Sequence, residues 1–326
     1  MNKNIIVVGA SYGGVEAMKT LVGGLPEKFP GTVLLVQHLS PTSPSLLPEI
    51  LAAAGPLPVS FLKDIQPLKA GHIYVAPPDH HLLLEQGHVR LTRGPKENSF
   101  RPSIDALFRS AAYAYGPRVV GVILTGLLDD GTAGLWAVKD RGGTAIVQDP
   151  KEAIAPSMPK SAMQNVEVDY RLSLSDIALT LNELAHTPAV KEGTHAVSER
   201  MKAEVEIARE NRAIDERIQE MFETSSFTCP ECHGVLLQLK EGAILRFRCH
   251  TGHAYSAVTL LEDGEGGVES SLWGAVRSLE ERILLLRHFA EHLESNSRSA
   301  DAAALLQEIE KTKKKADFVR QAVTLG

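Results

Sequence analysis

The sequence predicts an α/β fold, in which a mostly parallel sheet carries helices on both faces in the doubly wound arrangement. Two observations lead to this class. Strand-like and helix-like segments alternate from residue 4 to about residue 186. The strand-like segments are almost continuous in Val, Ile and Leu, which is typical of parallel strands buried on both faces. The remainder of the chain predicts a small β unit and a C-terminal helical hairpin.

The elements of the large domain follow one another in a regular order. The expected strands are 5–8, 32–37, 72–76, 119–124 and 144–148. Helical patterns lie between them, near 14–25, 44–54, 102–115 and 132–141. A small hairpin is expected where 82–84 and 89–91 flank the turn sequence EQGH. This alternation predicts helices that cross over between parallel strands.

The composition excludes several classes of function. The chain has 326 residues, of which 44% are hydrophobic and 23% charged, as in ordinary globular proteins. A net charge of −6 provides no basic field for nucleic acid. No apolar run approaches the ~18 residues of a membrane span, and the N-terminal apolar stretch is too short for a signal peptide. We therefore expect a cytoplasmic protein with no nucleic-acid partner and no membrane insertion.

The segment GASYGG, residues 9–14, follows the first expected strand. A dinucleotide-binding turn would need glycine where Ser11 stands, and no Walker sequence occurs at this turn. Gly9 to Gly13 instead complete the pattern G-x-S-x-G, in which small residues let a sharp strand-to-helix turn expose the serine hydroxyl. The start of the next helix offers free N–H groups to a developing anion. Ser11 is therefore a candidate nucleophile.

A serine nucleophile needs a general base and an acid that orients it, and other strand ends supply both. His38 follows the second strand in LLVQHLSP. Asp129 and Asp130 follow the strand that ends at Leu124, in TGLLDDGTAG. Because the carboxyl ends of parallel strands meet at one edge of a sheet, we expect these side chains and Ser11 to lie close together.

Five segments together resemble a known family. They are IIVVGASYGGVEA, LLVQHLSP, GHIYVAPPDHHL, RPSIDALFRSAA and GVILTGLLDDGTAG, in this order over about residues 4–185. This stretch is similar to the catalytic domain of the chemotaxis protein-glutamate methylesterase, CheB. The resemblance implies that Ser11 is the nucleophile, His38 the general base and Asp130 the residue that orients the imidazole. Asp129 falls at a position that the family lets vary.

The resemblance also implies a reaction. The family hydrolyses glutamate methyl esters on chemoreceptors and can deamidate glutamine there, so the implied partners are methyl-accepting chemotaxis receptors or a related signalling complex. It implies no cofactor for catalysis. A backbone N–H in the family's TGM loop helps to bind the oxyanion, and Leu127 occupies the methionine's place. A backbone donor tolerates this change of side chain.

The chain departs from the family pattern in three places. Tyr12 stands where threonine is usual, which favours a narrower pocket or a different substrate. Leu128 replaces a glycine; if that glycine needs a positive φ, the oxyanion loop is shaped differently here. The sequence begins four residues before the first catalytic strand, so we expect no receiver domain and no activation through one. The alternatives are therefore a serine esterase of another substrate, and a non-catalytic scaffold or signalling module.

Three polar residues in PPDHHL allow two interpretations. Asp79, His80 and His81 either lie at a turn and at the edge of the expected hairpin, or line the mouth of the site. The turn is the preferred interpretation, and none of the three is assigned a catalytic role.

The only cysteines, three in number, lie between residues 229 and 249. Their segment, FTCPECHGVLLQLKEGAILRFRCHTGHAYS, contains C-x-x-C, sixteen residues, and C-x-x-x-H, with two short strands and a glycine turn between. This pattern predicts a zinc ribbon with a closed, structural site made by Cys229, Cys232, Cys249 and His253. His233 and His250 are rival ligands that fit the spacing less well. The alternative is a set of reduced, buried thiols.

The chain after residue 186 divides into further segments. A charged helix is expected at about 199–222, with one apolar face made by Ile207, Ile214, Ile218 and Met221. Residues 270–323 predict a helical hairpin whose seam is Leu272, Val276, Leu279, Ile283, Leu286, Ala290 and Leu293. The seam is expected to pack on the neighbouring helix; the alternative is a docking face for a partner or for a second copy of the chain. The expected units are a methylesterase domain (1–190), a linker and charged helix (191–225), a zinc-ribbon-like segment (226–256) and a helical hairpin (257–326). Similar extensions occur on CheB-like proteins without a receiver domain.

Overall fold

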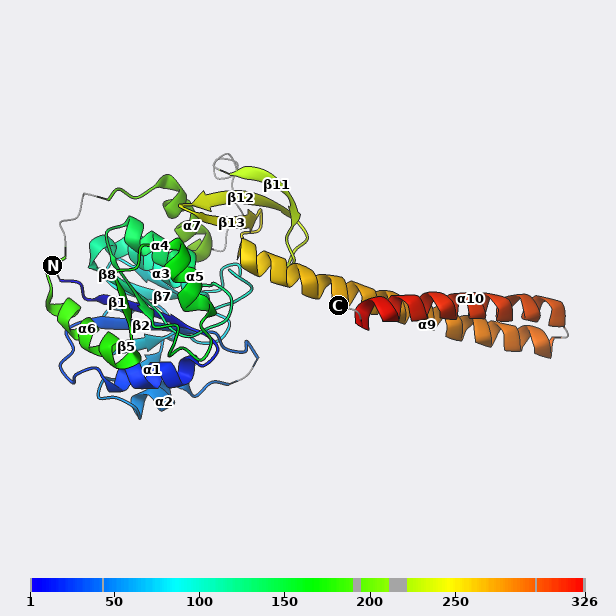
Figure 1. Cartoon of the computed structure of the whole chain (residues 1–326), viewed down its shortest axis with the longest axis horizontal. Coiled ribbons are helices and arrows are strands. Elements are labelled where there is room, and N and C mark those ends of the chain that lie inside the picture. The colour runs from blue at the N-terminus through cyan, green and yellow to red at the C-terminus, as the bar shows by residue number, and fades with distance from the viewer. Residues whose placement is uncertain (1, 43, 190–194, 211–221, 297, 325–326) are drawn as a thin grey trace. The chain divides into compact units, whose positions relative to one another are not determined.

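The computed structural model describes residues 2–42, 44–189, 195–210, 222–296 and 298–324 (Figure 1). Two compact units are present, Met1–Leu260 and Leu261–Gly326. The first unit holds the large sheet and the cysteine-bearing strands, and the second is helical. Among the described residues, no helix is both long and apolar enough to cross a membrane.

The first unit is built on a seven-stranded sheet in which all neighbouring strands are parallel, with the order β10-β9-β8-β1-β2-β5-β3. Its strands are β1 (Ile5–Ala10), β2 (Thr32–Gln37), β3 (Val59–Phe61), β5 (His72–Val75), β8 (Val119–Ile123), β9 (Thr144–Gln148) and β10 (Tyr170–Leu172). The chain runs outward from β1 through β2 and returns on the other side of β1 at β8. Open α/β sheets bind ligands at such a reversal, beyond the carboxyl ends of the strands.

Helices cover both faces of this sheet. The core on one face packs against α3 (Ile104–Tyr115), α4 (Thr132–Asp140) and α5 (Ser157–Asn165). The core on the other face packs against α1 (Gly14–Gly23), α2 (Leu47–Ala52) and α6 (Leu174–His186). Successive residues of β1 enter opposite cores, because side chains alternate along a strand. The fold class that the sequence predicts is therefore confirmed.

Several elements were not predicted. In the large domain they include β3, β10, α5, α6 and a two-residue strand, β4 (Gln66–Pro67). In the cysteine segment, the strands at 223–228 and 254–256 were not predicted either. The strand β4 joins the expected hairpin, β6 (His81–Glu85) and β7 (His88–Thr92), in a three-stranded sheet. The strands β3, β4 and β10 have two or three residues each, which is too few to show an alternation of apolar and polar side chains. The helix α6 did have a start signal, since the hydroxyl of Ser173 accepts a hydrogen bond from the N–H of Asp176.

The cysteine segment forms a four-stranded antiparallel sheet. Its strands are β11 (Glu223–Thr228), β12 (Val235–Glu241), β13 (Ile244–Cys249) and β14 (Ala254–Ser256). The expected glycine turn joins β12 to β13, with Gly242 at a φ of 59°. We call residues 223–256 the ribbon. The preceding helix, α7 (Glu199–Glu210), buries Ile207 and packs Ala208 against α3 and β6. Three residues of its expected apolar face, Ile214, Ile218 and Met221, lie outside the described residues.

Two long helices, α9 (Ala257–Ser295) and α10 (Ser299–Thr324), follow the ribbon. The helix α9 begins at Ala257, thirteen residues before the expected start at 270, and continues through Gly264, Gly266 and Gly267. The expected seam is the least exposed side of α9, with Val276, Ile283, Ala290 and Leu293 buried. Ala290 and Leu293 pack against Ala302 of α10. The seam therefore faces the neighbouring helix at this end of the hairpin.

Candidate active site

Ser11 stands on a sharp turn directly after β1. Its N–H donates to the carbonyl of Thr125 (3.0 Å), and its own carbonyl accepts from the N–H of Gly14 (2.9 Å) at the start of α1. Gly13 has a φ of 78°, a left-handed conformation that glycine adopts without steric cost. This local geometry carries the Ser11 side chain to the carboxyl edge of the sheet, as the G-x-S-x-G pattern predicts.

His38 reaches Ser11 from the end of β2. Nδ1 of its imidazole lies 3.1 Å from the hydroxyl oxygen of Ser11. The backbone of His38 is tied to the same turn, because its N–H donates to the carbonyl of Ala10 (3.2 Å). Gln37 adds a further tie, with its side-chain amide donating to the Ser11 carbonyl (2.8 Å). The ends of β1 and β2 therefore hold the side chains of Ser11 and His38 in a fixed relative position.

Asp130 contacts the other ring nitrogen of His38. Its Oδ2 lies 2.8 Å from Nε2 of His38. The carboxylate is buried and accepts hydrogen bonds from several further donors: the N–H groups of Ile104 (2.8 Å), Gly131 (3.0 Å) and Asp105 (3.3 Å), the hydroxyl of Ser103 (3.0 Å) and the amide of Asn98 (2.8 Å). Burial alone would raise the pKa of Asp130, but the hydrogen bonds, first of all from His38, hold it below its usual value. The carboxylate is therefore ionised at neutral pH.

These contacts select one tautomer of His38. An ionised carboxylate only accepts hydrogen bonds, so Nε2 carries the proton and donates it to Asp130. Nδ1 is then free to accept the proton of the Ser11 hydroxyl. The structure thus brings Ser11, His38 and Asp130 together in the arrangement of a serine hydrolase triad.

Phe100 covers the imidazole. Its ring is stacked on that of His38, with centroids 3.7 Å apart and an angle of 8° between the planes. Phe100 was not predicted as a site residue, because nothing in its local sequence indicates which ring it meets.

An open cleft of about 460 Å³ lies over the triad. Among the residues that line it are Ser11, Tyr12, His38, Asp79, Lys96, Phe100, Arg101 and Leu127. Tyr12 and Leu127 expose 62% and 55% of their surfaces, so apolar groups stand at this edge. The rim is also charged, since Lys96 forms an ion pair with Glu231 of the ribbon.

The loop of residues 125–128 lies directly beside Ser11. The hydroxyl of Thr125 donates to the carbonyl of Tyr12 (2.9 Å), and the close packing leaves no room for a side chain at position 126. Within the described residues, no protein acceptor meets the backbone N–H of Tyr12 or of Leu127. Leu128 has a φ of 57°. Leu128 therefore has a left-handed backbone conformation, which a glycine at this position would adopt at a lower energetic cost.

Asp129 points away from His38. Its Oδ1 accepts hydrogen bonds from the hydroxyls of Ser256 (2.7 Å) and Thr259 (3.2 Å). Burial raises the pKa of Asp129, and these hydrogen bonds oppose the shift. Of the two adjacent aspartates, only Asp130 contacts the imidazole, and Asp130 is the one to which the family resemblance gives the orienting role.

The residues of PPDHHL divide between the two interpretations. Asp79 lines the cleft and forms ion pairs with Arg93 and Arg101. His81 is fully buried at the edge of the hairpin, where Nε2 donates to the carbonyl of Pro95 (2.9 Å) and Nδ1 accepts from the N–H of Ser103 (3.2 Å). The mouth of the site thus includes Asp79, and His81 supports the loop before α3.

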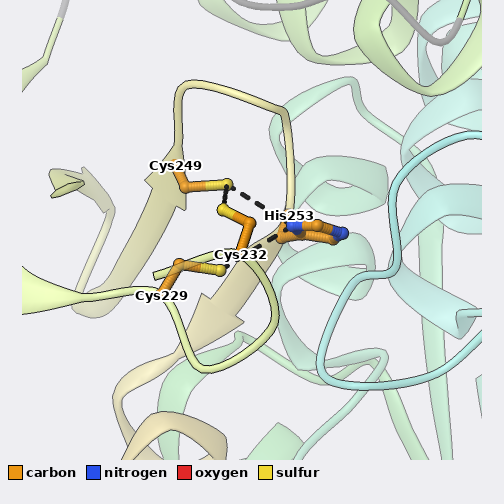
Figure 2. Close-up of side chains that lie close together, drawn as sticks. All are labelled: Cys229, Cys232, Cys249 and His253. Carbon is orange, nitrogen blue, oxygen red and sulfur yellow. Dashed lines mark hydrogen bonds between the residues drawn. The ribbon is translucent and has the colours of Figure 1, made fainter. Parts of the chain in front are cut away.

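The ribbon brings three thiols and an imidazole together (Figure 2). The ligand atoms of Cys229, Cys232, Cys249 and His253 all lie within 4.8 Å of one another. Nδ1 of His253 is 3.7 Å from Sγ of Cys229 and 3.6 Å from Sγ of Cys249, which is itself 3.6 Å from Sγ of Cys232. Zn–S and Zn–N bonds of about 2.3 and 2.0 Å give a tetrahedron with edges of about 3.5–3.8 Å. The group therefore could hold a metal ion of zinc's size.

The rival histidines are not part of this group. Neither His233 nor His250 belongs to the cluster found among the described residues. A hydrogen bond from Cys229 lowers the pKa of Cys249, which favours its thiolate form. No disulfide joins the three cysteines.

The parallel sheet and the Ser–His–Asp line at its carboxyl edge define an α/β protein with a hydrolase-type site. Residues 6–181 match the family model of the CheB methylesterase, and the chain belongs to this family. A protein-glutamate methylesterase/protein-glutamine glutaminase of Anaeromyxobacter dehalogenans is 38% identical over 180 residues, which are 55% of this chain and 53% of that protein. A Leptospira interrogans protein with both activities in its name is 41% identical over 179 residues, covering 55% of this chain and 93% of that one.

A solved structure agrees with these similarities. The crystal structure of the Thermotoga maritima CheB methylesterase catalytic domain has 35% sequence identity and a TM-score of 0.53. It covers 56% of this chain and 98% of that domain. The similarities concern the large sheet and its helices, and the ribbon and the helical hairpin lie beyond the matched family model.

Sequence reasoning missed some of the residues around Asp130. Neither Asn98 nor Ser103 was assigned to the site. In the structure both donate to Oδ1 of Asp130. The only available signal was their place before α3, which gave no indication of their common partner.

Proposed function

We propose that the chain hydrolyses glutamate methyl esters on chemoreceptors and can deamidate glutamine at such sites. The observation that carries the proposal is the continuous line from the Ser11 hydroxyl through His38 to Asp130 below an open cleft. The relatives' names give both activities. The substrate would be a receptor segment that presents the ester to the cleft.

The first step forms an acyl-enzyme. Ser11 attacks the ester carbonyl while Nδ1 of His38 takes the hydroxyl proton. Asp130 stabilises the imidazolium through Nε2. The imidazolium then gives its proton to the departing methoxide, and methanol leaves. With a glutamine side chain, the same transfer releases ammonia.

The second step restores the enzyme. A water molecule gives a proton to Nδ1 of His38 and attacks the acyl carbon, and the bond to Ser11 breaks as the proton returns to its oxygen. The products are the glutamate carboxyl group and the free serine. The backbone N–H groups of Tyr12 and Leu127 are the donors available to the developing oxyanion, since neither has a protein acceptor within the described residues.

The test of the proposal uses receptors with labelled methyl groups. Wild-type chain should release volatile methanol, and Ser11→Ala should reduce the rate by at least about 10³-fold. Ser278→Ala, an exposed serine on α9 whose hydroxyl donates to the carbonyl of Gly274, is the matched control and should act as wild type. Methanol release that persists in Ser11→Ala contradicts the assigned nucleophile. Reaction with small esters alone would instead indicate a different substrate, and inertness in both assays a scaffold.

We further propose that the ribbon binds structural Zn²⁺ through its three thiolates and His253, and that the ion itself makes no contact with the ester. Four protein ligands leave no open position for a substrate. Purified chain should contain one equivalent of zinc, and Cys249→Ser should lose it and unfold the ribbon at a lower temperature. Glu231→Gln, which changes a neighbouring residue without removing a ligand, is the control. A zinc-free wild-type chain with an intact ribbon would contradict this assignment.

The division of labour along the chain is part of the proposal. Residues 1–190 carry the esterase, 191–225 the linker and charged helix, 226–256 the zinc ribbon and 257–326 the helical hairpin. The hairpin would dock to the receptor or to a related signalling complex in the cytoplasm.

A further inference from the structure

We infer that the ribbon is a positioning element of the active site: strand β14 holds Asn98, and Asn98 holds the catalytic carboxylate of Asp130. The inference rests on the proposed esterase function. It extends that function to a part of the chain that lies beyond the matched catalytic family model.

Asn98 is the central link. The side-chain Oδ1 of Asn98 accepts a hydrogen bond from the backbone N–H of Ser256 (2.8 Å). The backbone N–H of Asn98 donates to the carbonyl of Ala254 (2.7 Å). Because β14 occupies the oxygen end of the amide, the NH₂ end faces Oδ1 of Asp130 (2.8 Å) and Oδ2 of Asp105 (2.9 Å). Asn98 is buried and has a φ of 51°, a conformation that needs support from its surroundings. The backbone of β14 provides that support.

A second tie joins the same two parts of the chain. Asp129, the neighbour of Asp130, accepts hydrogen bonds from the hydroxyls of Ser256 and Thr259. The side chain of Ser256 thus contacts Asp129, and the backbone N–H of Ser256 contacts the side chain of Asn98. Two adjacent aspartates are therefore held from the ribbon side, one directly and one through Asn98.

Buried ion pairs hold the ribbon in this position. Glu97, next to Asn98, meets Arg248 (2.9 Å) and Arg246 (3.4 Å) of β13. Both arginines also pair with Glu204 of α7, at 2.9 and 3.0 Å. All four side chains are at most 2% exposed. A charge network without solvent is costly to separate, so the ribbon should remain docked beside Asn98.

The proposed metal site leads directly into β14. His253 precedes Ala254, and the carbonyl of His253 accepts from the N–H of Cys249 (2.9 Å). An ion held by these two residues would fix the loop from which β14 begins. Loss of the ion should therefore loosen the hydrogen bonds that β14 makes to Asn98.

The consequence for catalysis should appear in kcat. Asn98 is not among the residues that line the cleft, so its loss should leave substrate binding almost unchanged. It does donate one of the hydrogen bonds that keep Asp130 charged and aimed at His38. We expect removal of this donor to reduce kcat about ten- to a hundredfold, with KM within about twofold.

The experiment uses the full chain and the labelled-receptor assay. Asn98→Asp keeps an oxygen for the N–H of Ser256 and replaces the donor with a second oxygen, so kcat should fall by the stated factor. Ser256→Ala keeps the backbone N–H that Asn98 accepts from and removes the hydroxyl contacts to Asp129 and Thr259. It should reduce kcat about two- to fivefold, and it carries the test if Asn98→Asp does not fold. Asn165→Asp, the same chemical change on α5, should retain wild-type kcat. A folded Asn98→Asp with wild-type kcat, or an unchanged Ser256→Ala in its absence, overturns the inference.

A second readout does not depend on turnover. Hydrogen exchange of the backbone amides of residues 97–99 should become at least about tenfold faster after zinc is removed with a chelator, while the amides of β1 stay protected. Unchanged exchange at 97–99 would refute the link between the ion and Asn98. Wild-type chain that releases no methanol would refute the proposed function, and the exchange result would still decide whether the ribbon holds Asn98.

Discussion

The ring of Phe100 lies flat on the imidazole of His38, with the centroids 3.7 Å apart. Phe100 comes from the segment before α3, and His38 from the end of β2. The stack limits rotation of the imidazole and shields one of its faces from water. It therefore complements the hydrogen bond to Asp130, which fixes the ring only along one edge.

Removal of this stack should reduce activity without abolishing it. Aromatic pairs contribute about 0.5–1.5 kcal/mol, so Phe100→Ala should lower kcat/KM about two- to twelvefold. Phe100→Leu, which keeps apolar cover, should lie between this variant and wild type. Phe318→Ala, at an exposed position on α10, is the control. An unaltered rate of methanol release in Phe100→Ala would show that the hydrogen bonds alone hold His38.

Tyr12 should influence which substrate is accepted. Its side chain is largely exposed at the cleft and makes no contact with His38 or Asp130 that the structure records. Tyr12→Thr should therefore change KM for the receptor by several-fold while kcat stays within about twofold. The comparison is made with receptor and small methyl esters in parallel. A fall in kcat for both substrates would instead place Tyr12 in the chemical step.

Leu128 carries a backbone strain that glycine would relieve. At a φ of 57°, a residue with a Cβ costs on the order of 1 kcal/mol relative to glycine. Leu128→Gly should therefore raise the free energy of unfolding by about 1 kcal/mol, measured by urea denaturation. Leu127→Gly, at a neighbouring position without positive φ, should not stabilise the chain. If Leu128→Gly is destabilising, the contacts of the leucine side chain outweigh the strain.

His81 should make stability depend on pH. Burial lowers the pKa of His81, and both ring nitrogens are already used, one as donor and one as acceptor. Below the unfolded value of 6.5, the unfolded chain therefore binds more protons than the folded chain. The stability due to neutral His81 is present above about pH 6.5 and is lost as the pH falls through the lowered pKa.

The measurement compares unfolding free energies at pH 7.5 and 5.5. His81→Gln cannot be protonated, so its stability should decrease less than that of wild type over this interval. His186→Gln, at an exposed helix end, is the matched control and should follow wild type. Equal pH dependence in His81→Gln and wild type would show that His81 is not responsible.

Glu204 should be essential to the stability of the first unit. It is fully buried among the guanidinium groups of Arg109, Arg246 and Arg248. Glu204→Gln removes the negative charge and leaves buried cations, so we expect about 3 kcal/mol of destabilisation. Glu206→Gln changes an exposed residue two positions along α7 and should cost less than about 0.5 kcal/mol. Similar unfolding curves for the two variants would contradict the role of the network.

The predicted fold and site came from different kinds of local signal. Nearly continuous apolar segments such as Thr32–Gln37 predicted strands, because a strand that is buried on both faces needs apolar side chains on both. The G-x-S-x-G turn and the polar residues after β2 and β8 predicted which side chains meet at the edge. The four residues that could hold a metal ion were predicted from the C-x-x-C and C-x-x-x-H spacing. The short strands β3 and β10 could not be predicted, because three residues are too few to show an alternation of apolar and polar side chains. The helix α9 begins earlier than expected because it continues through Gly264, Gly266 and Gly267, which weaken the helical pattern in the sequence.

By itself, the sequence determined the fold class, through the alternation of strand-like and helix-like segments, and the family resemblance, through five motifs in order. It also singled out Ser11, His38, Asp130 and the Cys₃His group, because each stands in a short motif or after an apolar strand. Only the tertiary structure decided that Nδ1 of His38 faces Ser11, that Asp129 turns to Ser256, and that Asn98 and Phe100 surround the triad. These relationships join segments up to 158 positions apart, as between Asn98 and Ser256. Contacts at such separations depend on how whole elements pack, and no local pattern in the sequence encodes them.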